Sequence, residues 1–336
     1  MVAVLPSLLQ IEPKLGEAYG YDLIGDVHGC AQTLARLLEQ MGYKKIRGVY
    51  QHKNRQAIFL GDIIDRGPRI REALHLVRTM VEQGSAQMIL GNHELNAMAY
   101  CTPVAPGASE YLRPHTPSAT RQISETLRQF SRYPHEWRAF LNWFATLPLF
   151  LEIKHPLTHQ VFRAVHACWD QPLVDQHRYV YGDDAAGWSF VERASLKESL
   201  EYQTRLRLTG GIELRLPPGE VMRSADGYER DAFRAKFWVP DATTYGQIAF
   251  QPDPLPDHIA TAEITAEHRA NMVYYDQQQP PLFVGHYWLA GRPQPIASNL
   301  ACLDYSAVKY GRLVAYRMDG EAQLQKDKFA WVYVDP

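Results

Sequence analysis

Three short segments carry carboxylates, imidazoles and an amide at spacings that suit metal ligation. They read Gly25-Asp26-Val27-His28-Gly29, Gly61-Asp62-Ile63-Ile64-Asp65-Arg66-Gly67 and Gly91-Asn92-His93-Glu94. Each segment follows a short apolar run and precedes a helical pattern, as in a loop that joins the carboxyl end of a strand to a helix. Two isolated histidines further along, His166 and His286, also follow apolar runs. Since ligands bind beyond the carboxyl ends of strands in α/β sheets, the pattern predicts one shared site.

Six of these side chains are candidate ligands of two divalent cations. Asp26 and His28 alternate along one loop, so both can reach one cation, and Asp62 can bridge two cations through its two oxygens. The predicted partition is Asp26, His28 and Asp62 on one metal, and Asp62, Asn92, His166 and His286 on the other. Mixed oxygen and nitrogen ligands favour Mn²⁺, with Fe or Zn²⁺ as alternatives, over Mg²⁺ or Ca²⁺.

Three further residues are candidates for the chemistry itself. Two cations about 3.5–4 Å apart polarise phosphoryl oxygens and lower the pKa of a bridging water, which then attacks phosphorus as hydroxide. Arg66 can grip two phosphoryl oxygens because its guanidinium is planar. His93 is the candidate acid that protonates the leaving group, and Asp65 is the candidate partner that orients it. The pattern predicts hydrolysis of a phosphomonoester or phosphoanhydride bond.

The three motifs, in this order, resemble the phosphoprotein phosphatase (PPP) branch of the calcineurin-like metallophosphoesterases. The resemblance covers roughly the first hundred residues and two later islands, at His166 and at His286. It implies the roles given above: six metal ligands, a phosphate-binding Arg66 and a His93–Asp65 acid pair. Enzymes of this branch also carry a second phosphate-binding arginine. The candidates for it, which lack a motif, are Arg205, Arg207 and Arg223.

Two differences between this chain and the eukaryotic Ser/Thr protein phosphatases bear on the identity of the substrate. Eukaryotic Ser/Thr protein phosphatases carry Arg before the G-N-H-E motif, where this chain has Leu90, and H-G-G where this chain has His166-Ala167-Cys168. The pattern is more similar to bacterial relatives: diadenosine tetraphosphate hydrolases, small protein phosphatases and the phosphatase modules of RNA-repair enzymes. The segment from Ala301 to Ser306, followed by Gly311-Arg312-Leu313, resembles their closing hairpin.

Several functions remain open at this point. The expected substrate is a phosphorylated small molecule, a nucleotide or a phosphoprotein, so the alternatives include a dinucleoside polyphosphate hydrolase and a Ser/Thr protein phosphatase. A different class is a metal-binding scaffold that has lost catalysis. Such a scaffold is expected to lack one of Asp65, Arg66 and His93, and all three are present.

Composition narrows the class of partner. The 336 residues include 35 Lys and Arg against 37 Asp and Glu, a formal net charge of −2. A nucleic-acid partner therefore has little support, because such proteins usually carry a clustered basic excess. No apolar run approaches the length of a membrane span. The four dispersed cysteines form no C-x-x-C pair, which disfavours a disulfide framework or structural zinc and favours a cytoplasmic protein.

The apolar patterns predict the elements that position the site. Strands are expected at 21–24, 57–60, 88–90, 147–153, 160–165 and 282–284, and a closing pair at 300–303 and 313–317. Helices are expected after each of the three motifs, and one or two more over 121–144, broken near Pro134. The repeated strand–loop–helix order predicts a largely parallel sheet with helices on both faces.

The predicted fold class is α/β, a metallophosphoesterase-type αββα sandwich of two mixed sheets with a partly helical insertion. We expect a single domain over residues 1–336. Residues 175–279 are rich in Pro, Tyr, Arg and acidic residues with weak periodicity, and are predicted to be a loop-rich insertion or cap over the site.

Overall fold

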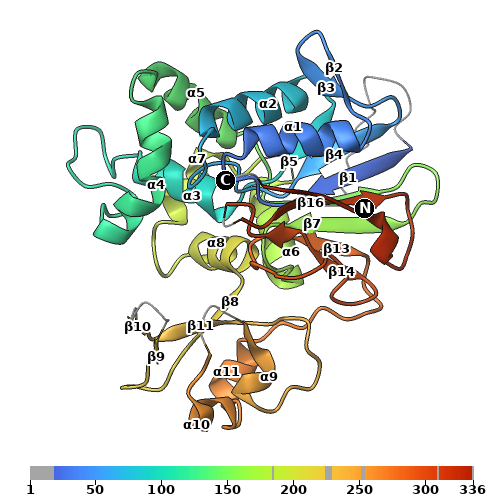
Figure 1. Cartoon of the computed structure of the whole chain (residues 1–336). Coiled ribbons are helices and arrows are strands. Elements are labelled where there is room, and N and C mark those ends of the chain that lie inside the picture. The colour runs from blue at the N-terminus through green and yellow to red at the C-terminus, as the bar shows by residue number, and fades with distance from the viewer. Residues whose placement is uncertain (1–18, 184, 224–228, 251–253, 309, 335–336) are drawn as a thin grey trace, which may run out of the picture.

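Two mixed β-sheets lie face to face at the centre of the computed structural model, which describes residues 19–183, 185–223, 229–250, 254–308 and 310–334 (Figure 1). The first sheet has the strand order β15-β16-β1-β4-β5, and β17 also pairs with β16. Strands β1, β4 and β5 run parallel, and β16 is antiparallel to its neighbours. Their bounds are β1 Gly20–Ile24, β4 Arg55–Phe59, β5 Ala86–Met88, β15 Asp304–Tyr305, β16 Arg312–Met318 and β17 Phe329–Tyr333.

The second sheet has the order β14-β13-β7-β6. Strands β7, β13 and β14 are parallel, and β6 pairs antiparallel with β7. The bounds are β6 Phe150–Lys154, β7 Val161–Val165, β13 Leu282–Val284 and β14 Leu300–Cys302. A separate hairpin joins β2 Lys44–Ile46 to β3 Val49–Gln51.

Alternation along the strands explains why the sheets pack together. Leu23 and Ile58, on β1 and β4, belong to the same buried cluster as Phe162 and Phe283 of the second sheet. The ring of Phe283 lies 5.1 Å from that of Tyr316 on β16, which joins the two sheets directly. The neighbouring residues in the strands point to the opposite faces and contribute to a second cluster with the helices. The result is the predicted αββα sandwich.

Helices cover the two outer faces of this sandwich (Figure 1). On the first sheet, α1 and α2 each bury one apolar face, including Leu34 and Leu37 on α1 and Leu74 and Val77 on α2. The break predicted near Pro134 is present, because Pro134 begins a new helix rather than continuing the preceding one. The bounds are α1 Ala31–Gln40, α2 Ile70–Glu82, α3 Asn92–Tyr100, α4 Pro117–Phe130, α5 Pro134–Phe144, α6 Gln171–Tyr181, α7 Gly187–Arg193 and α8 Leu200–Gly210.

The expectation of one sheet with helices on both faces is wrong. In the described part of the chain, helices cover the outer face of the first sheet, and the second sheet covers its inner face. Local sequence gives no sign of this, because a strand buried under another sheet and one buried under a helix are equally apolar. The third strand also ends earlier than predicted, at Met88. Beyond it, Leu90 donates its N–H to the carbonyl of Pro148 instead of to a strand.

The segment 175–279 contains more regular structure than the predicted loops. Its first part continues α6 and adds α7 and α8, which contact each other and α3. The second part lies at one end of the sandwich, beyond α8 (Figure 1). It contains β8 Ile212–Arg215, β9 Met222–Arg223, β10 Glu229–Arg230, β11 Ala232–Ala235, β12 Ala249–Phe250, α9 Tyr245–Ile248, α10 Asp257–Ala260 and α11 Ala266–Ala270. A 3₁₀ turn, Lys326–Lys328, precedes β17.

Strand register brings the candidate loops together. In the parallel pairs, Ile24 lies opposite Phe59, and Phe59 opposite Met88, so these three strands end at a common edge. Phe283 likewise lies opposite Ala164 in the second sheet. The loops that follow all five strands therefore meet at one end of the sandwich. Within the described ranges, no helix is long and apolar enough to cross a membrane.

Candidate metal centre

The candidate residues lie in loops that adopt a backbone conformation rare outside glycine. His28, Asp62, Asp65, Arg66 and His286 all have positive φ, between 43° and 67°. Such residues are uncommon and occur preferentially where the surrounding structure imposes the conformation, as at functional sites. The loops also touch backbone to backbone. A Cβ on Gly61 would lie 2.3 Å from the amide nitrogen of Gly91, so only glycine fits there.

Glu94 fastens two of these loops to each other. Its buried carboxylate accepts N–H bonds from Asp62 at 2.8 Å, Ile63 at 2.8 Å and Gly91 at 3.1 Å. Burial and the nearby Asp62 raise the pKa of Glu94. Sequence reasoning gave this residue no role, although an acid three residues after a helix N-cap is a known capping signal. Glu94 therefore fixes the loop backbone that positions the side chains of Asp62 and Asn92.

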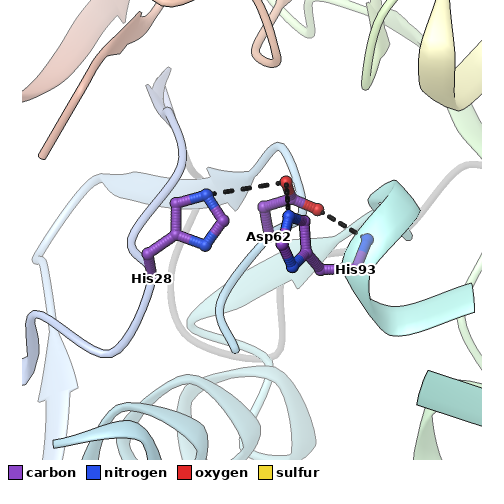
Figure 2. A group of neighbouring side chains, drawn as sticks. All are labelled: His28, Asp62 and His93. Atoms are coloured by element: carbon purple, nitrogen blue, oxygen red, sulfur yellow. Dashed lines mark hydrogen bonds and ion pairs between the residues drawn. The ribbon is translucent and has the colours of Figure 1, made fainter. Parts of the chain in front are cut away.

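Asp62 occupies the centre of the site. Its Oδ2 lies 3.7 Å from Nε2 of His28, 3.7 Å from Nε2 of His93 and 3.5 Å from Nε2 of His166. Figure 2 shows the imidazoles of His28 and His93 both directed at this carboxylate. Burial alone would raise the pKa of Asp62, but the surrounding histidines, His166 foremost, lower it well below its usual range. One carboxylate thus faces three imidazole nitrogens.

Two histidines are oriented by backbone carbonyls. Nδ1 of His28 donates to the carbonyl of Ile64 at 2.8 Å, and Nδ1 of His166 donates to that of Leu60 at 2.7 Å. Metal-binding histidines are commonly held in this way, because the bond fixes the ring and leaves the other nitrogen facing the metal. In both residues Nε2 is the nitrogen that faces Asp62.

Asn92 and His286 complete the side of the site next to His166. Oδ1 of Asn92 lies 3.1 Å from Nε2 of His166 and 3.0 Å from Nδ1 of His286. The backbone N–H of His286 lies 3.3 Å from both carboxylate oxygens of Asp26. The six predicted ligands therefore converge, although they come from loops up to 260 residues apart.

The three predicted catalytic residues lie against this cluster. Nδ1 of His93 and Oδ2 of Asp65 are 2.5 Å apart, and the hydroxyl of Thr126 donates to the other oxygen of Asp65. Arg66 extends Nη1 to Nε2 of His28 at 2.9 Å and Nη2 to Nε2 of His93 at 3.1 Å. The ring of Trp288 lies 4.7 Å from its guanidinium. Arg66 is exposed, so it can meet a ligand arriving from solvent.

Comparison with known proteins places this arrangement in a family. The model of the calcineurin-like phosphoesterases matches residues 21–198, which is more than half of the chain. The chain belongs to this family. The predicted resemblance to calcineurin-like metallophosphoesterases is thus confirmed, and the match contains five of the six candidate metal ligands.

Individual relatives of this calcineurin-like phosphoesterase match over a shorter stretch. The asymmetrical bis(5'-nucleosyl)-tetraphosphatase PrpE of Oceanobacillus iheyensis is 49% identical over 73 residues, 21% of this chain and 29% of that protein. PrpE of Bacillus subtilis is 38% identical over 74 residues, 22% and 30% of the two chains. The matches thus span less than a third of these relatives.

Solved structures of similar proteins match over most of the chain at low identity. A putative diadenosine tetraphosphatase aligns over 95% of both chains at 14% identity, with a TM-score of 0.45. A yeast protein serine/threonine phosphatase aligns over 96% of this chain and 81% of that one, also at 14% identity, with a TM-score of 0.46.

The donor set of the centre suits divalent cations. Ligand atoms of His28, Asp62 and His93 all lie within 4.8 Å of one another, as do those of Asp26, Asp62 and His166. Asp62 is common to both groups, as a bridging carboxylate requires. The predicted division of the six ligands between the two cations stays a prediction. Nε2 of His286 is buried without a hydrogen-bond partner among the described residues, so it is available as a ligand.

Burial shapes the charges of the remaining ligands. Burial lowers the pKa of His28 and of His286 well below the usual value, so both rings are neutral. The pKa of His166 instead rises to about 10, because Asp62 outweighs the effect of burial. The proton that His166 gains lies where a cation would bind. Since metal ligation requires a deprotonated imidazole, cation binding at this nitrogen releases the proton.

Besides Glu94, Asp304 is one of two residues next to the centre that sequence reasoning missed. It lies on β15, is 2% exposed, and its Oδ2 has no hydrogen-bond partner among the described residues. Burial raises the pKa of Asp304 to about 6. The pKa of Asp26 is also raised, first by burial and then by the neighbouring carboxylate of Asp304. The only signal was its position in the segment that resembles a closing hairpin.

Arg234 on β11 is the other missed residue. Its Nη1 lies 3.5 Å from the carbonyl of His286. The three predicted second arginines lie elsewhere: Arg207 is 3.6 Å from Asp170, Arg223 pairs with Glu229 in solvent, and Arg205 lies beside Tyr202. No motif marks Arg234, because it reaches the centre from the segment beyond α8.

Proposed function

We propose that this chain is a metal-dependent phosphoesterase that hydrolyses phosphomonoester or phosphoanhydride bonds. The main support is the carboxylate of Asp62, held between imidazole nitrogens of His28, His93 and His166 at 3.5–3.7 Å. Such a carboxylate is suited to bridging two cations. Membership of the calcineurin-like phosphoesterase family supports the same reaction class.

Six residues would hold the cations: Asp26, His28, Asp62, Asn92, His166 and His286. Their mixture of carboxylate, amide and imidazole donors favours Mn²⁺, Fe or Zn²⁺. Bound cations of this kind supply Lewis acidity toward phosphoryl oxygens and lower the pKa of bound water. We place Mn²⁺ first among them.

Arg66, His93 and Asp65 would serve the phosphoryl group and the leaving group. Arg66 binds phosphoryl oxygens through a guanidinium that the ring of Trp288 holds in place. His93 delivers a proton from Nε2 to the leaving oxygen. Asp65 accepts the N–H on Nδ1, which fixes the tautomer of His93 and stabilises its cation. These three side chains distinguish an enzyme from a metal-binding scaffold.

The substrate is a phosphorylated molecule, and the second candidate function is hydrolysis of dinucleoside polyphosphates. The similarity to PrpE tetraphosphatases favours this candidate over a Ser/Thr protein phosphatase. A cytoplasmic location remains a prediction.

Removal and return of metal test the proposal. Protein treated with a chelator is expected to lose hydrolysis of p-nitrophenyl phosphate and to regain it with Mn²⁺. Asp62→Asn is expected to lower kcat at least about a thousandfold, because cation charge stabilisation provides several kcal/mol. The matched control is Asp231→Asn, an exposed carboxylate in the segment beyond α8, which should behave like the wild type. Metal content by mass spectrometry accompanies each assay. Activity that survives chelation, or full turnover by Asp62→Asn, would contradict the proposal.

A further inference from the structure

Two arginines line a cavity beside α3, the helix that carries His93. Arg113, in the loop before α4, and Arg205, on α8, border a cavity of about 200 Å³ between α3, α7 and α8. Lys197, Asn96 and Tyr202 contribute to the same wall. Since a water molecule takes about 30 Å³ in the liquid, the space is large enough for a phosphate group.

Within the described residues, neither of these arginines forms a direct ion pair, although the more distant carboxylate of Asp65 acts on Arg113. Arg205 donates from Nε to the carbonyl of Ala194 at 3.3 Å and lies 5.1 Å from the ring of Tyr202. Arg113 donates from Nη2 to Oε1 of Gln122 at 2.7 Å. Across the described part of the chain, neither guanidinium has a carboxylate within 4 Å. Each guanidinium has five N–H groups, so most of its donors remain for another ligand.

Partial burial makes such an arrangement unfavourable without an anion. Burial lowers the pKa of both arginines, and the charge of Arg205 lowers that of Arg113 further. Two like charges that share a cavity repel each other, and a buried cation is costly unless it is paired. An anion in the cavity would remove both costs. The apolar members of the wall, such as Leu112, do not compensate a charge.

One side chain connects this cavity to the metal centre. Gln122 on α4 accepts from Arg113, and its Nε2 lies 3.2 Å from Nδ1 and 3.3 Å from Nε2 of His93. Asn96 lines the cavity from the same helix that carries His93. Gln122 alone therefore separates Arg113, in the wall of the cavity, from the proposed acid His93.

We propose that Arg113 and Arg205 bind a second phosphate group, carried by the leaving part of the substrate. This inference rests on the proposed phosphoesterase function and selects phosphoanhydrides among its substrates. In such a substrate water forms the new P–O bond and the bond to the bridging oxygen breaks. The departing phosphate takes the bridging oxygen, with the proton that His93 donates. That phosphate, or the next one in a polyphosphate chain, then lies between the two arginines.

The test compares a polyphosphate with a substrate that has one phosphate. We expect Arg205→Gln to lower the ratio of kcat/KM for diadenosine tetraphosphate to kcat/KM for p-nitrophenyl phosphate by about tenfold or more, through a higher KM for the tetraphosphate. This is the size of effect expected for a charge-assisted hydrogen bond. Arg205→Lys, which keeps the charge, should restore part of the ratio. Arg223→Gln, an exposed arginine paired with Glu229, is the matched control and should keep the wild-type ratio.

The outcomes separate this inference from the function on which it rests. An equal loss on both substrates would overturn the subsite, since it would indicate a structural role for Arg205. An unchanged ratio would overturn it as well. If the wild type hydrolyses neither substrate in Mn²⁺, the proposed function fails, and calorimetric titration with pyrophosphate then tests the subsite alone. Binding that weakens about tenfold or more in Arg205→Gln supports the subsite, and equal binding by both proteins overturns it.

Discussion

Charged side chains at the metal centre of the sandwich are buried, whereas those of an ion pair in the segment at 212–275 are exposed. In the sandwich, His28, Asp62, His93 and His166 are each at most 2% exposed and face one another. In the segment, Arg215 and Asp231 are 3.9 Å apart with side chains that are 83% and 74% exposed. Exposed pairs of this kind contribute little to stability. Buried, converging charges thus mark the part of the molecule suited to chemistry.

The two regions are nevertheless joined at the metal centre. Tyr287 follows His286 in the chain, and its ring lies 5.2 Å from Trp238 and 5.3 Å from Phe250, both in the segment. Arg234 of the segment lies beside the carbonyl of His286. The segment therefore contacts the metal centre through few residues, whereas the loops of the sandwich carry the candidate ligands. Three predictions test this division.

Of these three predictions, the largest effect on turnover is expected inside the sandwich, at His93. His93→Ala should lower kcat for an alkyl phosphate at least about a hundredfold, because a general acid contributes roughly a factor of 10²–10⁴. Loss on p-nitrophenyl phosphate should be smaller, since its leaving group departs without a proton. Steady-state kinetics on both substrates measure the difference. His135→Ala, at an exposed histidine, is the control and should change neither rate. Equal losses on the two substrates would remove the acid role.

A smaller effect is expected from the segment, at Arg234. We expect the guanidinium of Arg234, which lies beside the carbonyl of His286, to reach a phosphoryl group bound at the centre. Arg234→Gln should then raise KM for p-nitrophenyl phosphate about tenfold with little change in kcat, because one charge-assisted contact is removed. Arg215→Gln, on the neighbouring strand but in solvent, is the matched control. If both variants match the wild type, the segment does not contribute to phosphate binding. The residues that bind the phosphate would then come from the sandwich alone.

The third effect concerns stability rather than turnover, at His177 on α6. This ring is 3% exposed, packs against Phe150, Tyr181 and Phe190, and burial lowers its pKa to about 4. The unfolded chain, with a pKa near 6.5, therefore binds a proton first as the pH falls. The free energy of unfolding should drop by about 2 kcal/mol between pH 7 and pH 5 because of this group alone.

Urea denaturation at several pH values measures this contribution. His177→Leu lacks the titrating ring, so its free energy of unfolding should fall less than that of the wild type over the same range. Parallel curves for the two proteins would show that His177 does not carry the predicted pH dependence. The metal ligands take no part in the comparison, since the variant leaves them in place.

Sequence patterns predicted the positions of the strands in the sandwich more accurately than they predicted how the strands pack together. The strand predicted at 21–24 is observed at Gly20–Ile24, and the one predicted at 57–60 at Arg55–Phe59. Both have apolar runs and turn residues that act locally. The strand predicted at 147–153 begins only at Phe150, because pairing with β7 decides where it starts. In the segment beyond α8 the elements are too short for periodicity to show, and β8 and β11 have four residues each.

For the site, the amino-acid sequence alone is enough to identify the candidate ligands. Asp26, His28, Asp62 and Asn92 sit in short loops after strands, and strand ends at one edge of a sheet are close whatever the rest of the fold does. Tertiary structure decided the rest. It brought His28 close to His93 and Asp26 close to His166 and placed Glu94 between two loops. It also placed Arg234 beside the carbonyl of His286, and Arg113 and Arg205 in the wall of a neighbouring cavity. Spacing along the chain determines which residues are neighbours within one loop. Contacts between distant segments depend instead on how the two sheets and their helices pack.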